Sequence, residues 1–336
     1  MLVTHGLAPT RHALAGHGTA VSGFGTAVTG YGTAVTGYGT AVTIGNFDGV
    51  HLGHQAMLDR LKEEARSRRL ATCALTFEPH PREVFTPAQA PTRLTSLREK
   101  LELLAGFGLD RTHVEHFTRT FAALSPEAFV ERVLVHTLSA RWVLVGADFR
   151  FGAKRAGDLA MLRELGRTHG YEVAALDTVM HDGVRVSSSA VRAALACGDL
   201  AQAARLLGRN YSISGRVVHG DKLGRTLGYA TANIQLKHNR LPLNGIFAVR
   251  LHGAGAKARD GVASLGVRPT VKAEGSAAVL EVHVFDFAGD LYGRHVRAEF
   301  LSKIRDEEKY ADLDTLKAQI ARDCQAARKV LMEIKQ

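Results

Sequence analysis

Two histidines three residues apart, His51 and His54, follow an apolar run that ends at Ile44. A strand, a glycine-containing turn and the start of a helix follow one another here, in Gly45, Asn46, Phe47, Asp48, Gly49, Val50, His51, Leu52, Gly53 and His54. A helix N-terminus favours phosphate through its free N–H groups and its dipole. Two imidazoles add donors that can follow charge onto a leaving pyrophosphate, and Gly53 lets the backbone approach a phosphate chain. The segment therefore predicts nucleotide handling.

Two other interpretations of this histidine pair remain open. A pair at this spacing could hold zinc, although no cysteine or acidic cluster completes such a site. Both histidines could also be ordinary surface residues. The sequence contains neither GxxxxGK[ST] nor GxGxxG, which disfavours a P-loop kinase and a dinucleotide-binding dehydrogenase.

A second glycine-rich segment, residues 220–234, combines three glycines with two cations, and Lys222, Gly224 and Arg225 lie at its centre. Such a turn can fold over phosphates, because backbone donors and positive charge act together. Thr231 and Asn233 alternate onto one face of the extended stretch that follows. Their side-chain oxygens can therefore meet one Mg²⁺–nucleotide.

Glu281 lies in a predicted strand, where alternation places it on one face with His283 and opposite Leu280, Val282 and Val284. A carboxylate that faces a cavity can accept the proton of an attacking hydroxyl. The alternative is a solvent-facing strand carboxylate, of which any β-barrel has many.

The elements around the histidine pair alternate between strand and helix from residue 40 to about 196. Predicted strands at 71–77, 112–117, 141–146 and 171–176 are separated by predicted helices at 53–68, 96–105, 126–138 and 158–169. This order indicates an α/β fold with a doubly wound parallel sheet, whose ligand site lies at the carboxyl ends of the strands.

After residue 208 the pattern changes to closely spaced strands with glycine-rich turns, followed by a helix from about Leu313 to Ile334. This predicts a small antiparallel β-barrel with a terminal helix. We therefore expect three parts: an N-terminal segment 1–39, a nucleotide-binding domain 40–208 and a barrel domain 209–336. The N-terminal segment carries a tandem GTAVTGY repeat from Gly18 to Thr43, which we expect to be poorly ordered and without catalytic role.

Composition limits the classes of protein to consider. The 336 residues carry a net charge of +10 but no Lys/Arg block, so nucleotide sites are favoured over nucleic acid. No apolar run could span a bilayer and no secretory signal is present, so we expect no membrane association. Three distant cysteines fit neither a disulfide framework nor a CxxC metal site, which favours the cytoplasm.

The segment GNFDGVHLGHQ (45–55) resembles the signature of the bacterial bifunctional riboflavin kinase/FAD synthetases, within the broader group of HxGH nucleotidylyltransferases. Three further segments agree in order and spacing: TFEPHPREVF (76–85), VGADFRFGAKRAGD (145–158) and VRVSSSAVR (184–192). The resemblance implies that the first motif, including Gly45, Asn46, Phe47, Asp48, His51, Gly53 and His54, binds ATP. It further implies that Asp148 lies near FMN or ATP, and that Arg185, Ser187 and Ser188 form a second phosphate-binding motif.

The barrel segment resembles the family's riboflavin kinase motif, which usually ends in Pro-Thr-Ala-Asn, whereas Ala230 stands here in place of the proline. By this resemblance, Glu281 is the general base for the ribityl 5′-hydroxyl, and Thr231 and Asn233 hold Mg²⁺ with the ATP phosphates. Residues 300–307 resemble the flavin-side segment, in which Arg305 is the candidate ligand.

The implied protein phosphorylates riboflavin to FMN with ATP in its barrel domain, and adenylylates FMN to FAD in its N-terminal domain with release of pyrophosphate. Its partners would be flavins, ATP and Mg²⁺, with self-association possible. Two rivals remain: an enzyme with one degenerate site, prompted by Ala230, and an RNA-binding regulator, prompted by the basic charge.

Overall fold

The computed structural model describes residues 1–6, 39–220, 227–238, 240–267 and 278–334. Most of the GTAVTGY repeat and the predicted ligands Lys222, Gly224 and Arg225 lie outside these ranges. The chain divides into two compact units, which are described separately below. The first comprises residues 1–91 and 100–186, and the second comprises residues 92–99 and 187–336.

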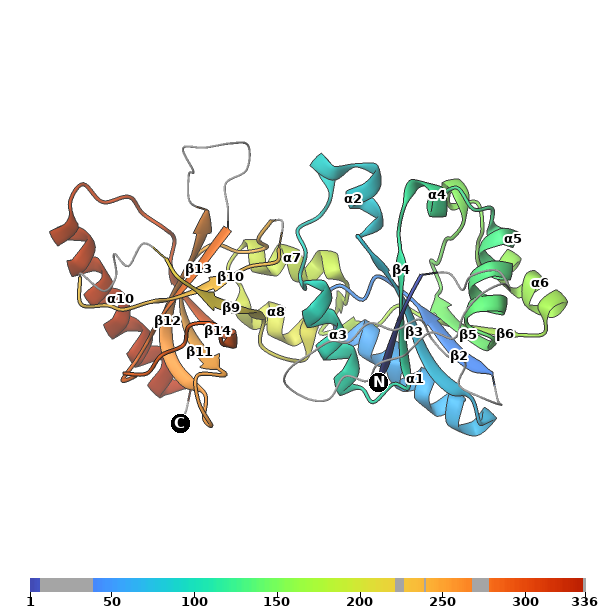
Figure 1. The fold of residues 1–336 in the computed structure, drawn as a ribbon, viewed down its shortest axis with the longest axis horizontal. Helices are drawn as coiled ribbons and strands as arrows, with labels where there is room; N and C mark the ends of the chain where they lie inside the picture. The colour runs from blue at the N-terminus through green and yellow to red at the C-terminus, as the bar shows by residue number, and fades with distance from the viewer. Residues whose placement is uncertain (7–38, 221–226, 239, 268–277, 335–336) are drawn as a thin grey trace. The chain divides into compact units, whose positions relative to one another are not determined.

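The first unit is built on a six-stranded sheet with the order β1-β4-β3-β2-β5-β6 (Figure 1). All five pairings are parallel. The strands are β1 (Leu2–His5), β2 (Thr40–Ile44), β3 (Ala71–Glu78), β4 (Arg111–His116), β5 (Ala140–Gly146) and β6 (Glu172–Leu176). The structure thus confirms the predicted parallel α/β sheet.

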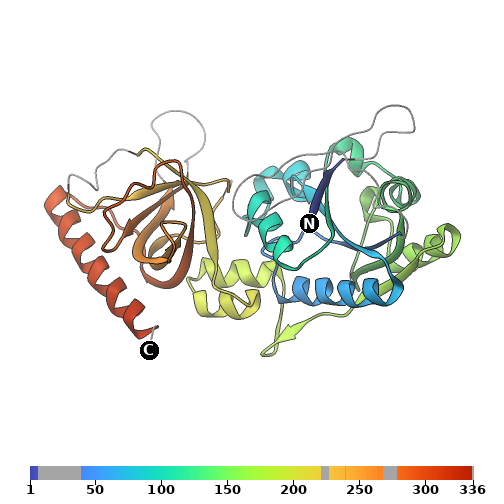
Figure 2. The ribbon, with the colours of Figure 1, turned by 60° about the horizontal axis from the view of Figure 1, so that its bottom comes forward.

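Helices cover both faces of this sheet. As a result, alternate residues of its central strands are buried in two separate hydrophobic cores. Val42 of β2 packs with residues of α5 (Pro126–Phe129), the π-helical turn η2 (Val130–Thr137) and α6 (Leu159–His169). Its neighbour Ala41 packs instead with residues of α1 (Leu52–Arg68) and α3 (Leu97–Gly106). In Figure 2 the blue helix α1 lies along one face of the sheet. Shorter elements are α2 (Pro81–Phe85), η1 (Pro87–Gln89), α4 (Arg119–Ala122), η3 (Ala153–Arg155), β7 (Met180–His181) and β8 (Val184–Arg185).

The start of the chain corrects one expectation. Residues 1–39 were expected to be poorly ordered, but Leu2–His5 forms β1, which pairs in parallel with β4 at the edge of the sheet. Its Val3 is buried, and the side chain of Thr4 contacts His113 of β4. Four residues are too few to show a periodicity, so the sequence pattern alone missed this strand.

The histidine motif follows β2, the strand from which later strands are added first on one side and then on the other. From β2 the chain proceeds to β3 and β4 on one side, and β5 and β6 then add on the other side of β2. Ligands of open α/β sheets bind beyond the carboxyl ends of the strands at such a switch point. The motif between β2 and α1 begins at this position.

The second unit contains a closed barrel with the order β10-β13-β12-β11-β14-β9, in which every pairing is antiparallel. Its strands are β9 (Ser212–Val218), β10 (Ala232–Gln235), β11 (Gly245–His252), β12 (Arg259–Val267), β13 (Ala278–Val284) and β14 (His295–Arg305). Large side chains such as Phe247 and Phe300 are fully buried. The predicted small barrel is confirmed.

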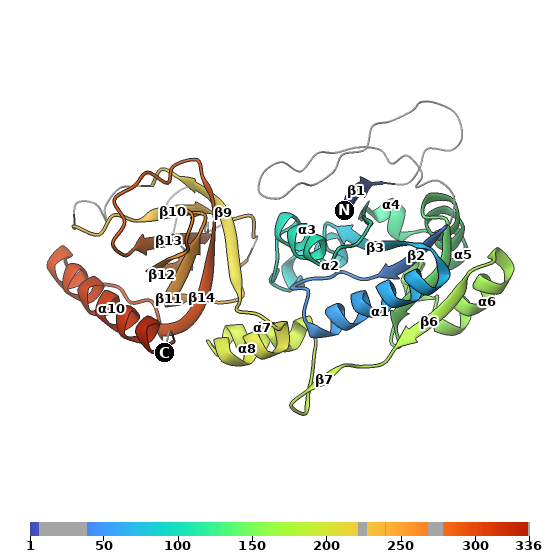
Figure 3. The same ribbon diagram turned by 90° about the horizontal axis from the view of Figure 1, so that it is seen from below.

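The described residues of this unit also form the helices α7 (Ser188–Ala196), α8 (Leu200–Leu207) and α10 (Leu313–Glu333). Figure 3 shows α10 along the outside of the barrel, where Cys324, Ala327 and Leu331 pack against Ile246 and Val262. The helices α7 and α8 belong to the same compact unit as the barrel. The boundary expected from the sequence lies after α8, between residues 208 and 209. Within the described parts of the chain, no helix has the length and apolar character needed to cross a membrane.

Candidate active sites

The loop after β2 has a strained backbone. Phe47 and Val50 have φ values of 48° and 41°, in the left-handed region that β-branched residues in particular avoid. The hydrogen bonds that hold the loop include those from the Gly45 amide to Leu75 O (3.0 Å), from the Thr76 hydroxyl to Asn46 O (3.2 Å) and from the Gln55 side chain to Val50 O (2.9 Å). Strain of this kind persists where the surroundings enforce it, and it concentrates at functional sites.

His51 and His54 lie against each other at the start of α1. Their rings stack with centroids 3.6 Å apart, and His51 Nδ1 accepts the His54 backbone N–H at 3.3 Å. Neutral His51 therefore carries its proton on Nε2. A Cβ at Gly53 would lie only 3.2 Å from the His51 ring, so the missing side chain makes room for that imidazole.

Burial lowers the pKa of His54 well below 6.5, and the charges of His51 and Lys100 lower it further. His54 is thus neutral at physiological pH. Its Nδ1 is buried and has no hydrogen-bond partner among the described residues. A buried polar atom without a partner costs free energy, and a phosphate oxygen could supply the missing hydrogen bond.

Lys100 is a member of this site that the sequence analysis missed. It is buried in α3, and its Nζ donates to Thr76 Oγ1 at 3.3 Å. Because the Thr76 hydroxyl donates onward to Asn46 O, the lysine supports the strained loop and places a positive charge beside His54. In the sequence, Lys100 is one of two cations in an amphipathic helix, and no motif marks it.

The other residues predicted from the first motif differ in accessibility. Phe47 is fully buried with its ring 5.1 Å from that of His54, so its side chain supports the histidine by packing. Asp48 is also buried, whereas Gly45 and Asn46 are partly exposed. The backbone of this loop and its two imidazoles are therefore the groups suited to meet a ligand.

Two candidates from separate segments, Asp148 and Arg185, come together as an ion pair of 2.9 Å. Asp148 follows β5, and Arg185 ends β8. Both side chains are well exposed, so this contact contributes little to stability and can be exchanged for a ligand. Ser187 is the N-cap of α7, and its hydroxyl accepts the Ala190 N–H at 3.1 Å, while Ser188 is the first residue of that helix.

In the barrel, Asn233 and Glu281 are directly opposite each other on the antiparallel strands β10 and β13. Paired residues share a face with Cβ atoms about 5 Å apart. Their neighbours Ile234, Leu280 and Val282 are buried in the interior, so both polar side chains lie on the outer face. Thr231, just before β10, continues the same alternation.

His283 fixes the chain beside Thr231. Its Nδ1 is 2.9 Å from the carbonyl oxygen of Ala230, which can only accept, so the imidazole donates. Its ring also contacts those of Tyr229 and Phe285. The residue that replaces the family's proline is thus held by a hydrogen bond.

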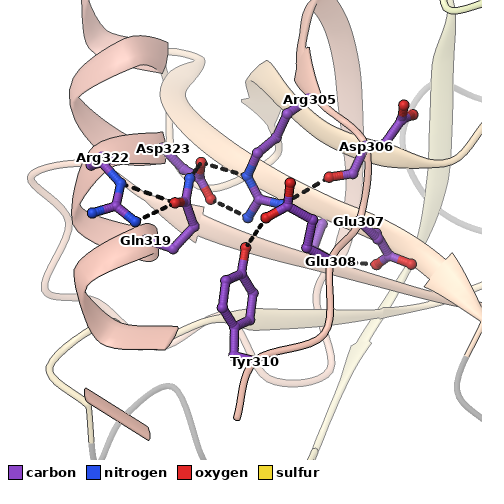
Figure 4. A network of polar contacts seen from close by, with 9 residues as sticks. Arg305, Asp306, Glu307, Glu308, Tyr310, Gln319, Arg322 and Asp323 are labelled. Carbon is purple, nitrogen blue, oxygen red and sulfur yellow. Dashed lines mark hydrogen bonds and ion pairs between the residues drawn. The ribbon is translucent and has the colours of Figure 1, made fainter. Parts of the chain in front are cut away.

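Arg305 is committed to contacts inside the protein (Figure 4). Its Nε and Nη2 donate to the two carboxylate oxygens of Asp323 at 2.8 and 2.7 Å, and its Nη1 donates to Asp306 O at 2.8 Å. This pairing raises the pKa of Arg305. Arg305 therefore joins the end of β14 to α10 and orders the segment that follows it.

Among the described residues, no group of three or more His, Cys, Asp or Glu side chains could hold a metal ion. The zinc interpretation of His51 and His54 thus gains no support. Thr231 and Asn233 offer neutral oxygens, which fit a Mg²⁺ ion that arrives with nucleotide phosphates.

Comparisons with known proteins place both parts of the chain in known families. The FAD synthetase family model matches residues 35–190, and the riboflavin kinase model matches residues 207–331. A bifunctional riboflavin kinase/FMN adenylyltransferase from Escherichia coli K12 is 50% identical over 85% of this chain and 91% of its own length. The protein of the same name from Haemophilus influenzae is 44% identical over 85% and 92%.

A crystal structure from Streptococcus pneumoniae, described as a macrolide-efflux protein, is 28% identical with a TM-score of 0.74, covering 87% of this chain and 95% of that one. The two family models together account for most of the chain, in the order that the sequence predicted. The chain belongs to the family of bifunctional riboflavin kinase/FMN adenylyltransferases.

Proposed function

We propose that riboflavin is phosphorylated on the outer face of β10 and β13, with Glu281 as the general base. The observation that carries this proposal is the register that sets Glu281 opposite Asn233. Glu281 accepts the proton of the ribityl 5′-hydroxyl as that oxygen attacks the γ-phosphorus of ATP, and ADP leaves. Thr231 and Asn233 hold Mg²⁺, which neutralises phosphate charge when it is bound. Lys222, Gly224 and Arg225 serve the ATP phosphates.

For the second reaction, we propose that His51 and His54 bind the ATP phosphates at the start of α1. The FMN phosphate attacks the α-phosphorus, the bond to the β-phosphate oxygen breaks, and pyrophosphate leaves. The two imidazoles donate hydrogen bonds to the oxygens that gain charge, and the strained loop keeps these donors in place. Arg185, Ser187 and Ser188 assist with phosphate, and Asp148 lies beside the flavin nucleotide or ATP.

Two of the three parts expected from the sequence carry the two activities: FMN adenylyltransferase in residues 40–208 and riboflavin kinase in residues 209–336. The three cysteines are free thiols, which fits a reducing compartment such as the cytoplasm. Flavins and ATP are the partners, without nucleic acid or membrane.

Two point variants test this assignment of residues to reactions. Glu281→Gln should lose riboflavin phosphorylation by roughly a hundredfold or more, yet convert supplied FMN to FAD at the wild-type rate. His54→Gln should convert riboflavin to FMN and stop there. If either variant lost both steps equally, or if Glu281→Gln kept full kinase activity, the assignment would be wrong.

A further inference from the structure

Three strands present one polar row on the outer face of the barrel. Glu281 of β13 pairs with Asn233 of β10 on one side and with Ser264 of β12 on the other. The flanking residues Leu265 and Val282 are fully buried in the interior, so Ser264 faces outward with Glu281. The hydroxyl of Ser264 is therefore a direct neighbour of the proposed general base.

A second carboxylate lies at the end of this row. The Ser264 hydroxyl donates to Glu307 Oε1 at 3.0 Å. Two residues further along β12, on the same face, a side chain at Gly266 would overlap the Glu307 carboxylate. Ser264 thus orients the Glu307 carboxylate, and Gly266 leaves room for it. Glu307 itself is exposed to solvent. A carboxylate accepts about four hydrogen bonds, so one bond from Ser264 leaves most of that capacity available.

The segment that carries Glu307 is held from the opposite side. Arg305 donates two hydrogen bonds to the carboxylate of Asp323 in α10 and a third to Asp306 O. In Figure 4, Glu308 turns toward the Tyr310 hydroxyl, whereas Glu307 points away from this network. Two consecutive glutamates therefore have different surroundings, and only Glu307 faces β12.

We propose that Glu307 is a specificity-determining residue of the kinase site that accepts hydrogen bonds from the secondary hydroxyls of the ribityl chain. This inference rests on the proposed role of Glu281, which faces the reacting primary hydroxyl. A neutral polyol offers several O–H donors along its length, and a row with a carboxylate on either side of the Ser264 hydroxyl suits such a chain. Hydrogen bonds to ionised acceptors are the stronger kind, and buried or bound polar groups discriminate against analogues that lack the partner.

The test compares Glu307→Gln with Glu308→Gln, a change of the same charge one residue away. Both are assayed as full-length protein with riboflavin and with an analogue in which a 5-hydroxypentyl chain replaces the ribityl chain. The analogue keeps the reacting hydroxyl and lacks the secondary ones. We expect Glu307→Gln to raise the KM for riboflavin about tenfold with little change in kcat. Its KM for the analogue should match that of the wild type, and Glu308→Gln should behave as wild type with both substrates.

Each other outcome overturns the inference. An equal loss on riboflavin and on the analogue would mean that Glu307 does not contact the secondary hydroxyls. A fall in kcat with a changed Mg²⁺ dependence would make Glu307 a metal-site residue.

Ser264→Ala should show the same pattern as Glu307→Gln to a smaller degree. If the wild-type protein phosphorylated neither substrate, the proposed function would fail first. An unchanged kcat for riboflavin phosphorylation reports that the barrel of each variant is folded.

Discussion

The side chains of Asn233 and Glu281 lie directly opposite each other across the pairing of β10 and β13. One is the proposed oxygen ligand for magnesium with ATP, and the other is the proposed base for the hydroxyl that attacks the same nucleotide. Their directly paired positions keep the Cβ atoms of the two residues about 5 Å apart. Positioning is most of what phosphoryl transfer requires from a protein, and a rigid barrel wall supplies it.

The bond from His283 to Ala230 gives a first prediction. His283→Phe keeps an aromatic ring beside Tyr229 and Phe285 but removes the donor to Ala230 O. Thr231 then becomes less well ordered, and we expect the KM of the kinase for Mg·ATP to rise about fivefold. Steady-state kinetics with riboflavin measure this, with Tyr229→Phe as the control. An unchanged KM would show that the hydrogen bond does not order the approach to Thr231.

The lowered pKa of His54 predicts how stability depends on pH. Below pH 6.5 the unfolded chain binds a proton at this residue that the folded protein excludes, so His54 costs stability as the pH falls, and nothing above pH 6.5. His54→Gln should therefore become more stable relative to the wild type below pH 6.5, by up to about 1.4 kcal/mol per pH unit. Denaturation followed by the fluorescence of the single tryptophan, Trp142, reports on the first unit. The exposed His116→Gln serves as control, and parallel pH curves for His54→Gln and the wild type would contradict the prediction.

Removing the charge of Lys100 should change the titration of His54. Lys100 is one of the causes that lower this pKa, so Lys100→Met should move it up toward 6.5. Loss of the support through Thr76 should also reduce FMN adenylylation, by about tenfold. NMR titration of the His54 ring measures the first effect, and Lys62→Met, at a partly exposed lysine of α1, is the matched control. A His54 pKa that does not move would separate Lys100 from this site.

The Arg305–Asp323 pair predicts a large effect on the stability of the barrel unit. Arg305→Met leaves the Asp323 carboxylate, which is 5% exposed, with only Gln319 as a hydrogen-bond donor in this network. Loss of one partner of a buried pair costs about 3 kcal/mol. Thermal unfolding and hydrogen exchange of α10 should show this loss. The exposed Arg322→Met should change stability by less than about 0.5 kcal/mol, and equal effects of both variants would contradict the role given to Arg305.

Local sequence patterns predicted most of the fold. The alternation of strands and helices up to residue 196 and the close spacing of strands after residue 208 were sufficient for the parallel sheet and the barrel. The predicted helix at 126–138 does begin at Pro126, where the Ser125 hydroxyl accepts the Ala128 N–H. The edge strand Leu2–His5 was missed, because its place in the sheet depends on a pairing with β4 more than 100 residues away.

For the sites, the sequence predicted residues that lie inside motifs and missed those that act from a distance. His51 and His54 share one helix start, so their spacing was enough. Lys100 reaches the same loop only through the packing of α3. Likewise, no local pattern could indicate that Glu307 approaches Ser264, 43 residues earlier in the chain.

The most direct test of the central claim is a time course of the wild-type protein with riboflavin, ATP and Mg²⁺, with the flavins separated by chromatography. The account predicts that FMN accumulates first and FAD follows, and that chelation of Mg²⁺ stops both steps. FMN alone would mean that the His51–His54 site does not adenylylate FMN. The absence of FMN from riboflavin and of FAD from supplied FMN would contradict the account as a whole.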